Sequence, residues 1–250
     1  MIAAGLVLRN PLAMNSSVQS ISYSNLLLSL IPVGILLAIL YRWSIEVGTA
    51  LIGLARMGLQ LVLAGYVLVY IFGSDNPLVV LSMLFLMVLA ASWIALRSVQ
   101  QYRRELFWTA IGSIALSGCG TLALITQGVL ALEPWYLPRY LIPLAGMIFA
   151  SVMNSVSLAA ERLVAETARG IDYPNARVIA LNAALIPIIN SLFAVGLVSL
   201  PGMMTGQILS GVSPMIAVNY QIMVMLMTFG ASGLGSVCFL LLAEKRLYRN

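Results

Sequence analysis

Residues 178–243 read VIALNAALIPIINSLFAVGLVSLPGMMTGQILSGVSPMIAVNYQIMVMLMTFGASGLGSVCFLLLA and contain no Asp, Glu, Lys or Arg. About 20 mostly apolar residues are enough for one helix to cross a bilayer. The uncharged run is therefore long enough for two crossings and a connector between them. The connector PGMMTGQILSGVSP carries Pro201-Gly202 at its start and Gly211 and Pro214 near its end, residues that interrupt helices.

The rest of the chain has the same character. Of its 250 residues, 61% are hydrophobic and 8% are charged, against roughly 25% charged in a soluble domain. The apolar runs are continuous and lack the two-residue alternation of a membrane barrel. The sequence predicts an all-α, polytopic protein of the cell membrane, with a short N-terminal arm at 1–21 and a single transmembrane domain at 22–250. The seven expected spans are 22–41, 47–71, 77–97, 107–130, 139–160, 177–199 and 216–243.

The basic residues predict the orientation. If the seven spans alternate, ten Lys and Arg residues fall on one side of the membrane and two, Arg9 and Arg139, on the other. Basic loops are retained in the cytoplasm, so we expect the N-terminus outside and the C-terminus in the cytoplasm. The ten residues on the expected cytoplasmic side are Arg42, Arg97, Arg103, Arg104, Arg162, Arg169, Arg177, Lys245, Arg246 and Arg249.

The connector is the first candidate for a substrate path. We expect Pro201 and Gly202 to end the sixth span and to leave irregular backbone lining a cavity, because such backbone is not tolerated in contact with lipid. Met203 and Met204 add thioether sulfur, which binds soft or borderline metals, although packing is an alternative role for both. The other polar candidates for the path are Thr205, Gln207, Asn154, Asn190 and Gln221.

Arg56 lies near the middle of the second expected span, with Gln60 one turn later on the same face. A charge at that depth is costly and must face other helices or water. All eight acidic residues lie in loops or at span ends, so the carboxylate relay of an ion-coupled transporter is missing. Two interpretations remain open, a role in the substrate path and a structural role in which Arg56 binds backbone carbonyls.

Several functions are excluded by absent residues. The chain has no histidine and no G-x-x-x-x-G-K-[ST] phosphate loop, so we expect neither an enzyme nor an ATPase. Its basic residues are scattered rather than gathered in a patch, which argues against nucleic acid as a partner. Cys119 and Cys238 lie in separate apolar runs, where free thiols are expected.

Three stretches resemble one known family. Residues 184–225, with LPGMMTG followed by YQI, together with 55–72 and 143–163, are similar to the FetB-type metal-resistance permeases and their plant aluminium-tolerance relatives. The resemblance implies the membrane subunit of an ATP-binding-cassette (ABC) exporter of iron or another metal. It implies a lipid-embedded permease homodimer whose ATP is bound by a separate cytoplasmic ATPase, and no cofactor on this chain.

The chain departs from this family between Glu161 and Arg177, where the segment resembling an ATPase-docking helix is shortened or missing. The remaining candidate is the stretch 161–169, with Glu161, Arg162, Glu166 and Arg169, and the loop 96–106 is a second contact. An ATP-independent metal channel or facilitator is therefore the alternative function. A membrane sensor is less well supported, because no large domain lies outside the expected spans.

Overall fold

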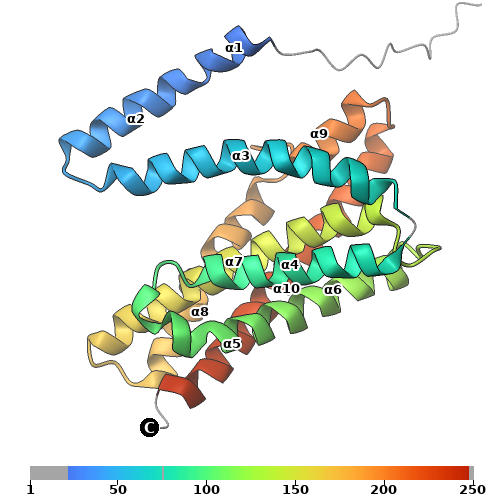
Figure 1. The fold of residues 1–250 in the computed structure, drawn as a ribbon. Coiled ribbons are helices and arrows are strands. Elements are labelled where there is room, and N and C mark those ends of the chain that lie inside the picture. The colour runs from blue at the N-terminus through green and yellow to red at the C-terminus, as the bar shows by residue number, and fades with distance from the viewer. Residues whose placement is uncertain (1–21, 75, 248–250) are drawn as a thin grey trace, which may run out of the picture. The chain divides into compact units, whose positions relative to one another are not determined.

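The structure is a computed structural model that describes residues 22–74 and 76–247, so the predicted arm at 1–21 lies outside it. Seven helices are long and apolar enough to cross a membrane, and no strand is present among the described residues (Figure 1). The prediction of an all-α protein with seven spans is confirmed. The chain forms two compact units, one containing residues 22–69 and 202–217 and the other 70–201 and 218–247.

The first unit consists of two apolar helices and a short one. The chain enters α1 (Tyr23–Leu28) through Ser22, whose hydroxyl accepts a hydrogen bond from the Asn25 backbone N–H. The first span, Ser24–Arg42, combines α1 with α2 (Leu30–Arg42), the second span is α3 (Val47–Phe72), and the short helix is α9 (Gly202–Leu209).

The connector differs from the sequence prediction. The sixth span, α8, ends at Ala194 rather than at Pro201, and Gly196 then takes a left-handed φ of 83°. Pro201 directly precedes α9 and Gly202 is its first residue. The prediction of irregular backbone through Met203 and Met204 is therefore wrong, because residues 202–209 are helical. A proline is compatible with a helix start, where no backbone hydrogen bond is lost.

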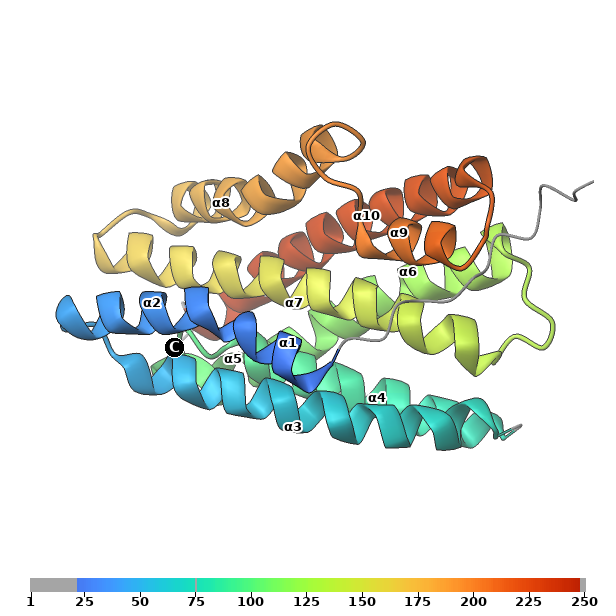
Figure 2. The same cartoon turned by 90° about the horizontal axis from the view of Figure 1, so that it is seen from above.

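The second unit contains the other spans (Figure 2). Asn76 caps the first of them by accepting a hydrogen bond from the Leu78 N–H, with Pro77 in the first helical position. Its elements are α4 (Pro77–Ala95), η1 (Gln100–Tyr102), α5 (Arg103–Ile114), η2 (Ala115–Cys119), α6 (Gly120–Ala123), η3 (Leu124–Val129), α7 (Pro138–Ala168), α8 (Tyr173–Ala194) and, from residue 218, α10 (Pro214–Leu247).

The fourth span is a composite helix. It begins as α5, widens to π-helix in η2, returns to α-helix in α6 and widens again in η3. Gly118 in η2 is closely packed, since an added Cβ would lie 2.6 Å from a ring carbon of Phe149 on α7. A π-helical turn contains an extra residue and is frequent at functional sites.

Small residues let α10 approach two neighbours. A Cβ added at Gly235 would lie 2.5 Å from Cγ1 of Val152 on α7 and 2.8 Å from the Ser117 hydroxyl on η2. The hydroxyls of Ser151 on α7 and Ser232 on α10 lie 2.8 Å apart. We call this contact the small-residue seam. The small residues of the seventh span thus serve packing inside the unit, as small residues do in membrane bundles.

One end of the second unit carries most of its charge. The end of α4, the start of α5, the end of α7, the start of α8 and the C-terminal end of α10 lie there (Figure 1). We call it the basic end, and its arginines and lysine are Arg97, Arg103, Arg104, Arg162, Arg169, Arg177, Lys245 and Arg246. An ion pair between Arg177 and Glu244, with N and O 3.9 Å apart, joins α8 to α10 at this end.

Candidate functional site

A cleft of about 360 Å³ opens at the basic end. The α4–α5 connection forms one wall and the last turns of α7 form the other. Beside it, the Ser98 and Ser157 hydroxyls lie 3.4 Å apart. The structure therefore brings together the two stretches, 96–106 and 161–169, that the sequence analysis had named separately. The lining residues are Arg97, Ser98, Val99, Gln100, Gln101, Glu161, Val164 and Ala165.

The cleft presents both signs of charge. Arg97 and Glu161 are exposed, and within the described ranges neither belongs to an ion pair. Gln100 and Gln101 add exposed amide groups that both donate and accept hydrogen bonds. Exposed, unpaired groups of both signs give a surface that selects a partner by electrostatic complementarity.

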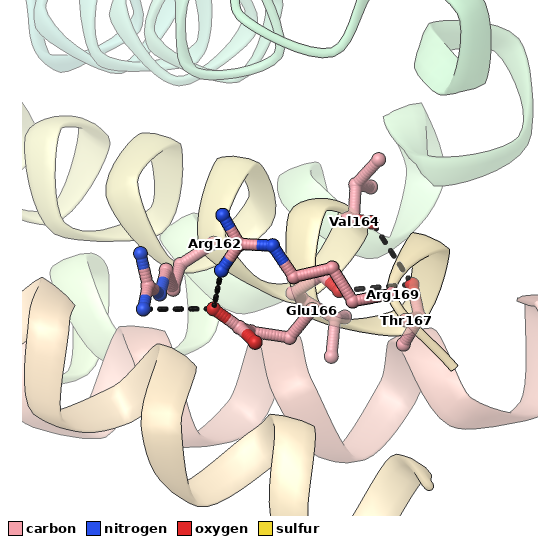
Figure 3. Close-up of polar contacts among 6 residues, drawn as sticks. Arg162, Val164, Glu166, Thr167 and Arg169 are labelled. Carbon is pink, nitrogen blue, oxygen red and sulfur yellow. Dashed lines mark hydrogen bonds and ion pairs between the residues drawn. The ribbon is translucent and has the colours of Figure 1, made fainter. Parts of the chain in front are cut away.

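Glu166 is the centre of an ion-pair cluster next to the cleft (Figure 3). Its carboxylate is 3% exposed, and Oε1 lies 2.7 Å from Nη2 of Arg162 and 3.0 Å from Nη1 of Arg169. The two arginine side chains remain 41% and 65% exposed. A buried carboxylate needs such partners. Glu166 therefore holds the two arginines in place, whereas Arg162 and Arg169 remain accessible to a second molecule.

The end of α7 is held firmly by backbone contacts as well. The Ile171 N–H donates to the Glu166 carbonyl at 3.2 Å and the Gly170 N–H to the Thr167 carbonyl at 3.0 Å, with Gly170 at a φ of 84°. This is the Schellman ending of a helix. The Thr167 hydroxyl also donates to the Leu163 carbonyl at 2.9 Å (Figure 3). The last turns of α7 are thus a fixed element on which the cleft is built.

The methionines predicted as metal ligands lie on α9 in the first unit. Met203 and Met204 are half-buried, Thr205 is exposed and Gln207 is half-buried. Met203 and Gln207 are four residues apart and share a helix face. The Gln207 side-chain Oε1 is buried and accepts no hydrogen bond among the described residues. One face of α9 therefore combines a thioether with an amide oxygen.

The polar candidates of the second unit lie at different depths. Ser151 contacts Ser232 and both helices run towards the basic end, so Asn154 lies near the level of Gly235. Gln221 then lies about 20 Å away along α10. Asn154 and Asn190 are exposed, whereas Gln221 is 5% exposed, and its Oε1 has no hydrogen-bond partner within the described chain. Asn154 and Gln221 therefore do not meet at one level of the unit, and a role of these three residues in the substrate path stays a prediction.

Arg56 and Gln60 are exposed on one face of α3 in the first unit. No ion pair of Arg56 occurs within residues 22–74 and 76–247. The two interpretations of Arg56 therefore both stay open. In the same ranges no group of three His, Cys, Asp or Glu side chains is placed to hold a metal ion, and both cysteines are free, as expected.

Sequence reasoning missed two features of the site. The burial of Glu166 has no signal in the sequence, since Glu161 and Glu166 lie on the same charged stretch and only packing separates them. The π-helical segments were missed because they leave the run of apolar residues unbroken. The glycines and serines of the fourth span are a signal that could have marked this helix as unusual.

The family comparison covers nearly all of the described chain. Residues 23–176 and 173–248 match the family described as "Uncharacterised protein family (UPF0014)". The UPF0014 membrane protein slr1647 of Synechocystis is 38% identical over 201 residues, covering 73% of this chain and 76% of the relative. No solved structure matches.

Two further relatives agree with the resemblance seen in the sequence. The probable iron export permease protein FetB of Escherichia coli is 32% identical over 240 residues, covering 90% of this chain and 91% of its own. The protein ALUMINUM SENSITIVE 3 of Arabidopsis thaliana is 31% identical over 222 residues, covering 81% and 80%. The chain therefore belongs to the UPF0014 family, the family of FetB, and is a multi-pass permease protein of the cell membrane.

Proposed function

We propose that this chain is the membrane subunit of an ABC-type exporter and that a separate cytoplasmic ATPase docks in the cleft at the basic end. The observation that carries the proposal is the meeting of residues 97–101 with Glu161 in one exposed cleft. The 32% identity with a relative named as a probable iron export permease supports the same reading. In this assignment the chain binds no cofactor itself, and ATP is bound by the partner.

The cleft is suited to transmit motion from a partner. Glu161 lies on α7. The last turns of this helix are fixed by the Glu166 ion pairs and by the Schellman ending. The same helix packs closely on α10 through Val152 and Ser151. A force applied at the cleft therefore acts on a rigid helix that reaches the centre of the second unit. Closely packed elements shift as units rather than deforming.

Recruitment of the ATPase tests the proposal. The permease is co-purified with candidate cytoplasmic ATPases, and metal-stimulated ATP hydrolysis is measured in liposomes. Arg97→Glu reverses a charge in the cleft, and we expect it to reduce co-purification at least tenfold, because like charges across an interface cost several kcal/mol. Arg139→Glu, a charge reversal at the start of α7 and away from the basic end, is the matched control. A permease that recruits no ATPase contradicts the proposal.

The cargo follows as a second part of the proposal. We infer that iron or another metal is exported, with the thioethers of Met203 and Met204 as ligands and the amide oxygen of Gln207 as a further contact. Replacing both methionines by leucine keeps volume and apolarity and removes only sulfur. We expect metal-stimulated hydrolysis to fall while co-purification of the ATPase persists. Unchanged transport would assign both residues to packing.

One observation favours a different mechanism, an ATP-independent channel or facilitator. The connection from α7 to α8 contains only residues 169–172, which leaves no room for a separate docking helix. Metal flux into liposomes that contain this chain alone, without ATP, distinguishes the two mechanisms. Flux that requires both the partner and ATP supports the exporter, and flux without them supports the channel.

The exporter also implies two copies of the permease. The resemblance to FetB-type permeases implies two permeases with two ATPases, and we therefore expect a permease homodimer in the bilayer. The mass of the complex in nanodiscs, measured with and without the ATPase, tests the copy number independently of transport.

A further inference from the structure

An arginine stacked on a tryptophan lies at the basic end of the second unit, apart from the cleft. The guanidinium carbon of Arg103 lies 4.4 Å from the centre of the Trp93 ring. Trp93 lies in the last turn of α4 and Arg103 is the first residue of α5. Neither residue lines the cleft. Stacking on an indole holds the guanidinium in one plane.

The Arg103 side chain lacks an acidic partner within the described residues. Its Nε–H is buried and has no acceptor among the described residues, and in the same ranges Arg103 and Arg104 form no ion pair. A buried donor without an acceptor costs free energy. Because Nε is buried, the two Nη groups are the donors that a ligand can reach, and a phosphate has enough oxygens to accept from both of them.

Three aromatic rings follow one another, starting from the ring that Arg103 covers. Trp93 packs edge-to-face on Phe107 with ring centres 5.8 Å apart, and Phe107 packs on Trp108 at 5.9 Å. Trp93 is 54% exposed and Trp108 is 69% exposed. Trp108 lies only about 8 Å along the helix axis from the start of α5. Tryptophan is favoured at the level of lipid headgroups.

We propose that Trp93, Arg103 and Trp108 bind the phosphate of an anionic phospholipid, with the acyl chains along the exposed rings. The guanidinium edge donates to the phosphate oxygens, and Arg104 adds a second positive charge beside it. The rings distinguish a lipid from a free phosphate ion, since they offer apolar area that only a lipid covers. This inference does not depend on an ATPase or on the cargo.

Fluorescence quenching by brominated lipids tests the site in the full chain. In a background with Trp43→Phe and Trp135→Phe, the remaining tryptophans are Trp93 and Trp108. We expect dibrominated phosphatidylglycerol to reach half-quenching at a mole fraction about fivefold lower than dibrominated phosphatidylcholine, the effect of one arginine at an anionic surface. Inorganic phosphate and glycerol phosphate are added as competitors without acyl chains.

Three variants sharpen the test. Arg103→Gln is expected to remove the preference for phosphatidylglycerol. Arg103→Lys is expected to weaken it, because lysine keeps the charge but lacks the paired N–H donors of the planar guanidinium. Arg246→Gln, which removes one exposed charge at the same end of the unit, is expected to keep it. Thermal unfolding in detergent confirms that each variant is folded. If Arg103→Gln does not fold, the weaker preference expected of Arg103→Lys tests the site in its place.

Three outcomes overturn the proposal. The first is equal quenching by the two lipids in the unsubstituted background. The second is an equal loss in Arg103→Gln and Arg246→Gln, which would show a general charge effect. The third is displacement of phosphatidylglycerol by free phosphate at equal concentration, which would show a phosphate site to which the acyl chains contribute no binding.

Discussion

The spans α3 and α7 are equally apolar by mean hydropathy, yet they are used differently. In α7 half of the most apolar window is buried, whereas in α3 none of it is. The glycines show the same contrast. Gly58 on α3 has open space around it, whereas Gly235 on α10, packed on α7, has neighbours within 3 Å of an added Cβ. Apolarity thus places a helix in the membrane, whereas small side chains and hydroxyls determine what it packs against.

The largest effect is expected from filling the small-residue seam. Gly235→Leu inserts a side chain where Val152 and Ser117 leave no room, and we expect a loss of about 3 kcal/mol or more in stability. Gly58→Leu on α3 is the matched control and is expected to change stability by less than about 0.5 kcal/mol. Steric trapping in bicelles measures both, and equal losses would remove the contrast between the two helices.

A smaller loss is expected from removing the buried carboxylate. Glu166→Ala deletes the partner of Arg162 and Arg169 at the end of α7, and we expect about 2 kcal/mol of destabilisation. This lies below the range for fully buried pairs because both arginines are partly exposed. Glu161→Ala, on the same helix but exposed, serves as the control. Thermal unfolding without added denaturant, monitored by circular dichroism, compares the stability of the two variants. An unchanged stability of Glu166→Ala would refute the structural role.

A buried hydroxyl at the basic end is expected to contribute less. The Tyr173 hydroxyl on α8 donates to the Leu240 carbonyl on α10, so Tyr173→Phe is expected to cost about 1 kcal/mol. Tyr66→Phe on α3, where the ring is 76% exposed, is expected to be neutral. Thermal unfolding of the two variants under identical detergent conditions provides the comparison. A Tyr66→Phe loss as large as that of Tyr173→Phe would argue that α3 is packed as tightly as α8.

The smallest effect is expected at the hydroxyl pair of the seam. A double-mutant cycle of Ser151→Ala and Ser232→Ala is expected to yield a coupling of about 0.6 kcal/mol, the average for interhelical hydrogen bonds in membranes. Steric trapping resolves a value of this size when all four proteins are measured together. A coupling of zero would show that close approach at Gly235, and not hydrogen bonding, holds α7 to α10.

The fold followed from the sequence more fully than the site. The second span was expected at 47–71 and is helical from Val47 to Phe72, because an apolar run of that length has no other stable form in a bilayer. The sixth span was expected to reach 199 but α8 ends at Ala194. The error arose because Val195 to Leu200 are mostly apolar, and apolarity does not reveal the left-handed turn at Gly196.

The candidate site divides in the same way. Both docking stretches were named from the family resemblance, whereas their meeting in one cleft, with Ser98 beside Ser157, required the packing of α4 on α7. The burial of Glu166 was not visible either, because a carboxylate is covered by neighbours distant in sequence. The substrate-path residues on α3, α7, α8, α9 and α10 stay predictions that transport measurements will test.

What the sequence determined by itself is the number and type of the spans, since bilayer thickness and the rise of a helix set the length of an apolar run. What only the tertiary structure decided is which faces meet. The seam at Gly235, the cleft between Arg97 and Glu161 and the stacking of Arg103 on Trp93 all join residues from different elements of the fold. Their proximity depends on side-chain shape at the contacts, which hydropathy does not encode.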